Sequence, residues 1–181
     1  MCVDLYANGS VLLNKKQDID HMEHASLFDE YRQILTKLSL DITQYYSAHD
    51  TYLSSFPKEI HKGLFSTQAD TENIFRGYFI YIHALTDTLR LSDNTANRLS
   101  ELILKADRSM QSDLILKCNR AMDKYISYRA SVTEYLSQNE NEINAKKQNA
   151  SLSFMLNTAT DLKLKTELLL KWLKEDSLSD S

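Results

Sequence analysis

Residues of the first third of the chain follow a seven-residue period. One series falls on every seventh position and a second follows three positions behind it: Phe28, Leu35, Ile42, His49 and Phe56, then Tyr31, Leu38, Tyr45 and Tyr52. Alternating steps of three and four residues place these side chains along one face of an α-helix. The pattern predicts a long coiled-coil-like helix over residues 19–56. Pro57 ends it, because the residue before a proline avoids the helical conformation.

The same kind of periodicity predicts three more helices, over residues 57–91, 95–136 and 150–175. The segment Ser92-Asp-Asn-Thr95 is interpreted as a turn, since Asp and Asn favour turns. In the third helix, one extra four-residue step near residues 110–118 fits a stutter, which a continuous helix tolerates. Residues 137–151 fit either an exposed helical extension or a connection. Four amphipathic helices joined by short connections predict an antiparallel up-down-up-down four-helix bundle.

Both ends of the chain are assigned outside this bundle, which spans residues 19–175. Residues 1–18 are expected to form a short irregular N-terminal arm, in which Asn8-Gly9 fits either a hairpin turn or the end of a helical stub. Residues 176–181 are expected to be a disordered acidic tail. The chain is therefore interpreted as one helical domain with two short extensions.

The amino-acid composition supports an all-α fold and argues against several classes of function. The 181 residues include 3 Gly and 1 Pro, too few for turn-rich β folds or for glycine-rich phosphate-binding loops. A net charge of -4 at pH 7 argues against nucleic acid and against an anionic membrane surface as partners. Cys2 and Cys118 are expected to be free thiols. We therefore expect a cytoplasmic protein or, as the alternative, one delivered into a host cell without a classical signal peptide.

The five histidines are the main candidates for chemistry. Residues 19–28, with the sequence IDHMEHASLF, resemble the opening helix of hemerythrin-like oxygen carriers, with His24 at the ligand position. That family also uses a His-x-x-x-Glu and a His-x-x-x-His pair, whereas Leu53 and Phe65 stand four positions after the next two histidines of this chain. The family's ligand set is absent. Nucleophile motifs are also lacking, so we expect no metal, no cofactor and no enzyme activity.

The first hypothesis for function is a non-catalytic interaction module: an adaptor, a complex subunit or a secreted effector without a signal peptide. Such a module would bind another protein, or a second copy of itself, through its helical seams and its last helix. The apolar face of that helix is wider than a simple seam, and its candidate partner-binding residues are Leu168, Leu169, Leu170, Trp172 and Leu173.

The alternative hypothesis is a regulatory bundle that binds a small ligand or a metal ion. In the predicted bundle, two histidines and several seam tyrosines meet near one pole and would line a polar pocket. The candidate residues of this pocket are His49, His61, Tyr52, Tyr128 and Tyr135.

Overall fold

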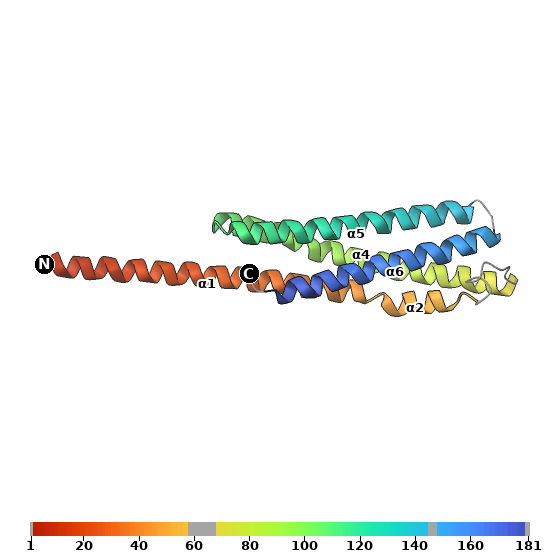
Figure 1. Ribbon diagram of the computed structural model, residues 1–181, viewed down its shortest axis with the longest axis horizontal. Helices are drawn as coiled ribbons and strands as arrows, with labels where there is room; N and C mark the ends of the chain where they lie inside the picture. Colours follow the sequence, from red (N-terminus) through yellow and green to blue (C-terminus); the bar gives the residue numbers. More distant parts are fainter. Residues whose placement is uncertain (1, 58–67, 145–147, 180–181) are drawn as a thin grey trace.

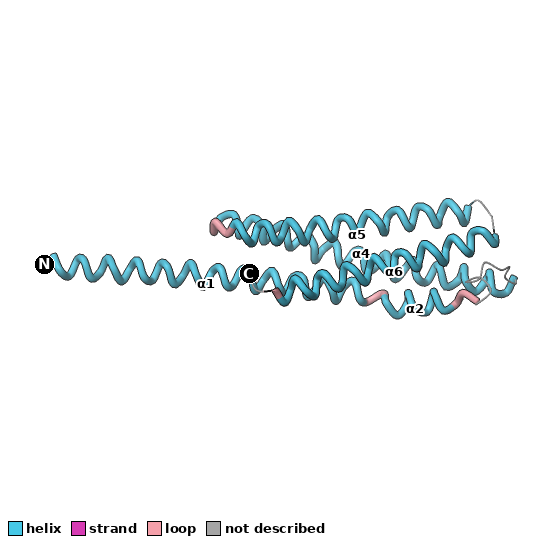
Figure 2. The backbone as a smooth tube through the Cα atoms, in the orientation of Figure 1, coloured by secondary structure: helices cyan, strands magenta, loops and turns pink. Residues whose placement is uncertain are grey.

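The computed structural model describes residues 2–57, 68–144 and 148–179, with side chains for 22–57, 70–141, 143 and 152–179. Every regular element in these ranges is an α-helix, which confirms the all-α prediction. The helices, also drawn in Figure 2, are α1 (Cys2–Thr43), α2 (Tyr46–Ser54), α4 (Gln68–Arg108), α5 (Ser112–Asn144) and α6 (Gln148–Leu178).

Four long helices pack against one another along a common direction (Figure 1). Helix α1 contacts α4 and α6, α5 contacts the same two helices, and the short α2 continues α1 and also packs on α4 and α6. The N-terminal end of α1 extends past the other helices (Figure 1). The core lies between the four long helices and is rich in tyrosine.

The heptad pattern of the first segment correctly identifies the residues of the core. All nine positions of the two series are buried, with 4% or less of each residue exposed. Burying a side chain of this size stabilises the folded state by about 1.5–3 kcal/mol relative to leaving it in water. Packing of this seam therefore holds α1 and α2 against the bundle.

The boundaries predicted for the first helix are wrong at both ends. Helix α1 begins at Cys2, so the expected irregular arm is helical, and Gly9 lies inside it at a cost of about 1 kcal/mol relative to alanine. The helix then ends at Thr43, short of Pro57. The Thr43 hydroxyl donates to the carbonyl of Ser39 over 2.6 Å, and such bonds to the preceding turn bend helices. A two-residue turn separates α1 from α2.

The expected turn at residues 92–95 is absent, because α4 runs through it from Gln68 to Arg108. The prediction failed because Ser92 and Thr95 make the hydrogen bonds of buried helical residues. The Ser92 hydroxyl donates to the carbonyl of Leu89, and the Thr95 hydroxyl lies within bonding distance of the Asp41 carboxylate. The hydroxyls of Ser92 and Thr95 thus bond within α4 and to a neighbouring helix, and they do not form a turn. The predicted 57–91 and 95–136 helices are therefore wrong.

The true turn between α4 and α5 lies at residues 109–111, where the sequence was interpreted as a stutter in one helix. The Gln111 N–H donates to the carbonyl of Ala106 (2.8 Å), and the Met110 N–H donates to Asp107 (3.1 Å). This pair of bonds is the Schellman motif, which ends helices at a residue with positive φ. Met110 takes that place with φ of 56°, although glycine usually occupies it.

Met110→Gly is expected to stabilise the protein by about 0.5–1 kcal/mol. The side chain of Met110 is 87% exposed and so loses little packing, while glycine adopts positive φ without the steric cost of a Cβ atom. Urea denaturation followed by circular dichroism measures the change. Met110→Ala is the matched control: it also removes the thioether but keeps Cβ, and it should give no stabilisation. Equal effects of the two variants would contradict this account.

The end of the chain differs from the expected tail. Helix α6 extends to Leu178, and the Tyr31 hydroxyl donates to the carboxylate of Asp176. The Lys117 ammonium also donates to the Ser179 hydroxyl over 3.3 Å. The prediction of disorder is therefore wrong for residues 176–179, because this segment bonds to α1 and α5, whereas residues 180–181 lie outside the described residues. Of the segment left open at 137–151, residues 137–144 and 148–151 are helical.

Candidate functional site

Four of the five residues predicted for a polar pocket lie in or beside one buried cluster. We call it the tyrosine–histidine cluster, and its members are Tyr45, His49, Tyr52, Tyr81, Tyr128, Tyr135 and Thr166. All are at least 94% buried. They come from the turn before α2, from α2 itself and from α4, α5 and α6. The fifth predicted residue, His61, lies outside the described residues.

Hydrogen bonds join one part of the cluster. The Tyr45 hydroxyl lies 2.5 Å from that of Thr166 and 3.0 Å from that of Tyr128, and Tyr128 and Thr166 are 3.0 Å apart. Thr166 also donates to the carbonyl of Leu162 in its own helix. Three hydroxyls from three elements thus satisfy one another inside the core. This triangle fixes the relative positions of α5 and α6 next to Tyr45.

Ring packing fills the other part of the cluster. The rings of Tyr52 and Tyr81 are stacked, with centroids 4.9 Å apart and planes 11° apart, and the ring of Tyr135 meets Tyr81 edge-on. His49 Nδ1 lies 2.8 Å from the Tyr81 hydroxyl. The cluster is therefore packed by its own side chains.

Three buried polar atoms of the cluster have no partner in hydrogen-bonding geometry among the described residues: His49 Nε2 and the hydroxyls of Tyr52 and Tyr135. Burial lowers the pKa of His49 to about 4, and the nearby Lys163 adds to this effect. Burial also raises the pKa of Tyr52 and of Tyr135, each with a further contribution from neighbouring tyrosines. All three groups are thus neutral near pH 7. Neutral phenols supply neither a general base nor a phenolate ligand for a metal.

The remaining described histidines are far from a metal-binding arrangement. His24 Nδ1 pairs with the side-chain oxygen of Gln111, and His83 is exposed beside Asp87. In the described ranges, no group of three or more His, Cys, Asp or Glu side chains could hold a metal ion. The resemblance of residues 19–28 to hemerythrin-like proteins therefore has no matching set of ligands in this part of the structure.

The residues of α6 that were predicted to bind a partner lie partly in the core and partly at the surface. Leu169 and Leu173 are buried at 6% and 0% exposure, and Leu170 is partly buried against the core. The prediction of an exposed surface is therefore wrong for Leu169 and Leu173, which the neighbouring helices cover, whereas Leu170 has the same intermediate exposure as Trp172. Leu168 is 67% exposed and Trp172 is partly buried, so these two residues remain candidates.

Leu168 and Trp172 line a groove between α5 and α6. Its apolar end is lined by Lys124, Ser127, Tyr128, Ser131, Lys165, Leu168, Leu169 and Trp172. A polar end continues from it, sharing Ser131 and Lys165, and is lined also by Glu134, Tyr135, Gln138, Thr158, Asp161 and Leu162. The two ends measure about 250 and 200 Å³. Together the two ends fall within the roughly 300–1,000 Å³ of small-molecule pockets, and each end alone has room for inserted side chains of a partner.

The two ends of this groove differ in charge. The Lys124 ammonium lies 5.8 Å from the centroid of the Trp172 ring, a cation–π contact. Lys165 pairs with Asp161 at 3.0 Å, so its charge is partly balanced. Glu134 lies at the polar end. The apolar end is therefore rimmed by cations. The sequence alone did not point to these residues of α5, because they are brought to Trp172 only by helix packing.

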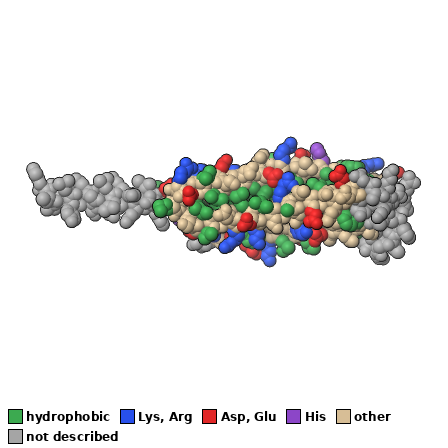
Figure 3. All heavy atoms as spheres, turned by 90° about the horizontal axis from the view of Figure 1, so that it is seen from above, with side chains coloured by type: hydrophobic (Ala, Val, Ile, Leu, Met, Phe, Trp, Pro, Cys, Tyr) green, Lys and Arg blue, Asp and Glu red, His purple; other side chains and the backbone are tan. Residues whose placement is uncertain are grey.

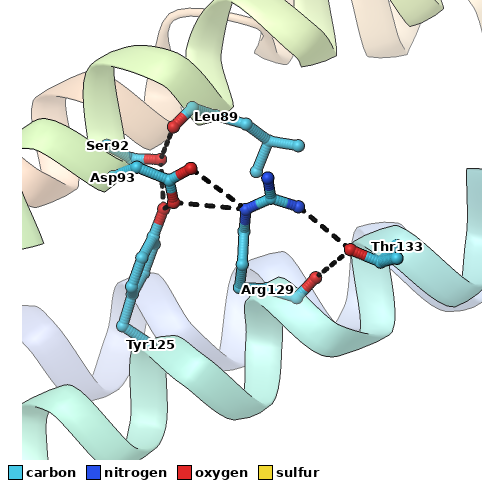
Figure 4. Close-up of polar contacts among 6 residues, drawn as sticks. All are labelled: Leu89, Ser92, Asp93, Tyr125, Arg129 and Thr133. Carbon is cyan, nitrogen blue, oxygen red and sulfur yellow. Dashed lines mark hydrogen bonds and ion pairs between the residues drawn. The ribbon is translucent and has the colours of Figure 1, made fainter.

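A second polar cluster joins α4 to α5 and has both buried and partly exposed members (Figure 4). Nε of Arg129 donates to both carboxylate oxygens of Asp93, at 3.2 and 3.3 Å, and the Tyr125 hydroxyl donates to the same carboxylate over 2.5 Å. The hydroxyl of Ser92 lies 2.7 Å from that of Tyr125. We call the Asp93–Arg129 pair the central ion pair. Both residues are a little over one third exposed.

Comparisons with protein-family models, curated proteins and solved structures give no match for this chain. Nor does any helix in the described part of the chain have the combination of length and hydropathy needed to span a bilayer.

Proposed function

We propose that this chain is a non-catalytic protein–protein interaction module that binds an amphipathic helix of another protein in the α5–α6 groove. The observation that carries the proposal is Leu168, a large apolar side chain two-thirds exposed beside Trp172 in that groove. An exposed aliphatic residue next to an accessible tryptophan is typical of a protein-binding site, since aromatic residues contribute much of the energy at interfaces.

The length of the groove fits a helix of several turns. It follows α6 from Thr158 to Trp172, and a rise of 1.5 Å per residue makes that distance about 21 Å. A bound helix of about four turns would cover it. Its apolar side chains, spaced three and four residues apart, would pack on Leu168 and Trp172.

Charge favours an acidic partner at the apolar end. Lys124 forms no ion pair among the described side chains, and its ammonium is held above Trp172. A carboxylate of the partner, placed beside its apolar side chains, would pair with Lys124. The partner we propose is therefore an amphipathic helix with carboxylates beside its apolar face.

The antiparallel up-down-up-down bundle is part of this proposal. Hydrogen-bonded pairs between neighbouring helices support it, because the residue numbers rise on one helix as they fall on the other. Between α1 and α6 the pairs are Tyr31 with Asp176 and Tyr45 with Thr166, the latter just past the end of α1. In such a bundle α5 and α6 are neighbours over most of their length, which is what a continuous groove requires.

The alternative, a regulatory bundle with a ligand in the tyrosine–histidine cluster, has less support. Its rings pack on one another, and the described residues include no group of three or more side chains that could hold a metal ion. We therefore place the binding function at the surface groove.

The test uses the fluorescence of Trp172, the only tryptophan of the chain. A synthetic 14-residue helical peptide with leucines spaced three and four residues apart and flanking glutamates is titrated into the full-length protein. We expect a saturable shift of the Trp172 emission. A peptide with lysine in place of each glutamate should bind at least tenfold more weakly. No saturable response to either peptide would overturn the proposal.

Two variants of α6 show whether binding occurs in the groove. Leu168→Glu should weaken the acidic peptide at least tenfold, because it puts a like charge on the apolar surface. Leu164→Glu is the matched control: Leu164 is 55% exposed on the same helix but does not line the groove. Equal weakening by both variants would place the peptide elsewhere and contradict the proposed site.

A further inference from the structure

A pocket between α4 and α5 has no part in the proposed function. It measures about 430 Å³ and is lined by Tyr78, Phe79, Ile82, Leu136, Glu140 and Ile143. Small-molecule sites have volumes of roughly 300–1,000 Å³ and mostly apolar walls, with a few polar groups that orient the ligand. Five of these six side chains are aliphatic or aromatic, and the sixth is a carboxylate. We call this space the α4–α5 pocket.

Two short stretches of helix form the walls of this pocket. On α4, Tyr78 and Ile82 are one turn apart. On α5, Leu136, Glu140 and Ile143 follow one another at steps of four and three residues, which places them on one side of that helix. The α5 wall is about 11 Å long at the rise of an α-helix. A bound helix of several turns needs a longer surface, so a pocket of this length suits a small molecule.

Aromatic rings of α4 form part of the wall. The ring of Phe79 lies edge-on to that of Tyr78, with centroids 5.7 Å apart and planes 66° apart. Phe79 is 63% exposed, so its ring is accessible, whereas Tyr78 is almost completely buried and contacts the ring of Tyr52. The face of an aromatic ring attracts a cation that lies within about 6 Å of it. These rings can therefore contact either an apolar group or a cation.

Glu140 gives the pocket a negative charge that no described side chain balances. It forms no ion pair in the described ranges and is exposed to solvent. Its carboxylate acts on the neighbouring phenol: burial raises the pKa of Tyr78 to about 12, and Glu140 adds to this rise. The phenol is therefore neutral at pH 7, and Glu140 supplies the charge of the pocket.

The charges next to this pocket are already paired. Figure 3, seen from the side of α5, shows charged side chains of both signs among the hydrophobic ones. The adjoining hollow shares Leu136 with the pocket and contains the central ion pair, held at 3.2 Å. Arg90 of the same hollow pairs with Asp87 at 3.3 Å. These cations are bound to carboxylates other than Glu140, which stays available to a ligand.

From this geometry we infer that the α4–α5 pocket binds a small organic cation, an amine or quaternary ammonium with an apolar body. The apolar body would lie against Ile82, Leu136 and Ile143, and the cationic group beside the Glu140 carboxylate and the aromatic rings. A neutral ligand would leave this carboxylate unpaired, and an anion would be repelled by it. Charge complementarity thus selects the class of ligand.

The inference does not depend on the proposed peptide groove. The two sites have no lining residue in common. Lys124, which contacts Trp172, lies 16 residues before Glu140 on α5, about 24 Å along the helix. A ligand in the α4–α5 pocket should therefore leave the Trp172 emission unchanged, so the failure of one proposal can be told from the failure of the other.

Three probes that share an apolar body and differ in charge test the class of ligand. They are phenylbutylamine, a cation at pH 7, neutral phenylbutanol and anionic phenylbutyrate. Isothermal titration calorimetry on the full-length protein should show that the amine binds at least tenfold more tightly than the alcohol, and that the anion does not bind. No binding of the amine, or equal affinity for amine and alcohol, would overturn the inference. Tighter binding of a pentalysine peptide would also overturn it, because the pocket would then receive a side chain of another protein.

Two glutamate variants test the role of the carboxylate. Glu140→Gln should reduce the affinity for the amine to that for the alcohol, and the affinity for the alcohol should not change. Glu134→Gln is the matched control: Glu134 is also exposed on α5 but does not line the pocket. It should leave both affinities as in the wild type. An undiminished affinity of Glu140→Gln for the amine would overturn the inference.

Two variants of α4 locate the bound amine. Phe79→Ala should weaken the amine and the alcohol alike, because it removes an aromatic wall of the pocket. Ile80→Ala is the matched control, since Ile80 is equally exposed at 63% but does not line the pocket. It should bind both probes as the wild type does. Equal weakening by both substitutions, or by neither, would place the amine elsewhere on the surface and contradict the proposed site.

Discussion

Leu38→Asp is expected to abolish the cooperative unfolding transition of the protein at neutral pH. Leu38 lies in the middle of the α1 seam and is fully buried. Replacing a buried leucine by a smaller residue alone costs about 2–5 kcal/mol, and burying an unpaired carboxylate adds several more. The sum is comparable with the entire stability of a typical domain, about 5–15 kcal/mol. Thermal and urea denaturation followed by far-UV circular dichroism measure the effect.

Leu40→Asp provides the matched control. Leu40 lies two positions further along the same helix and is 59% exposed, so the same carboxylate would remain in water. The change in unfolding free energy should stay within about 0.5–1 kcal/mol. If Leu38→Asp unfolded with the midpoint and cooperativity of the wild type, the seam would not be the core.

The core faces of the helices could be predicted because burial and periodicity have the same physical origin. A residue every three or four positions points to the same side of a helix, and in this chain that side faces the other helices. Thus Phe28, Leu35 and Ile42 were identified as core residues from spacing alone and are almost completely buried. Helix content and helix faces follow from local sequence.

Helix ends were harder to predict, because this chain makes turns without the usual residues. The turn at 109–111 has Met110 where glycine is expected, so the sequence gives no sign of it. A four-residue step in the heptad pattern fits a stutter and a turn equally well. At residues 92–95 the error was the opposite one, since a turn was predicted where the helix continues. Ser92 and Thr95 are residues typical of turns, but here their hydroxyls bond to groups inside the bundle.

The candidate sites were only partly predictable for a related reason. His49, Tyr52, Tyr128 and Tyr135 were recognised as seam residues, whereas Tyr81, which bonds to His49, was missed. In the last helix, the width of the apolar face does not tell which of its residues a neighbour covers. Leu169 is covered and Leu168 is not, and that difference depends on the position of α5.

The stability of the protein should fall as the pH drops from 6.5 toward 4, because of His49. Its ring is completely buried, and burial lowers its pKa from 6.5 to about 4, with Lys163 acting in the same direction and Asp50 and Glu167 against it. Between these two pH values the unfolded chain binds a proton at this residue and the folded protein does not. Stability therefore rises with pH in this window and is independent of His49 above it.

The size of the effect follows from the pKa difference. A full shift from 6.5 to about 4 corresponds to about 3 kcal/mol, of which about 2 kcal/mol is lost between pH 7 and pH 5. Urea denaturation at both pH values measures it. Carboxylates that titrate in the same range affect every variant alike, so the quantity to compare is the difference between the wild type and His49→Phe.

Two histidine variants test whether the burial of His49 causes this pH dependence of stability. His49→Phe should lose about 2 kcal/mol less than the wild type between pH 7 and pH 5, whatever its stability at pH 7. His83→Gln, which removes an exposed histidine beside Asp87, should keep the wild-type profile. Parallel profiles for His49→Phe and the wild type would mean that the His49 ring reaches water or a proton acceptor in the folded protein. The cluster would then contain space for a ligand, which the packing of Tyr52 on Tyr81 argues against.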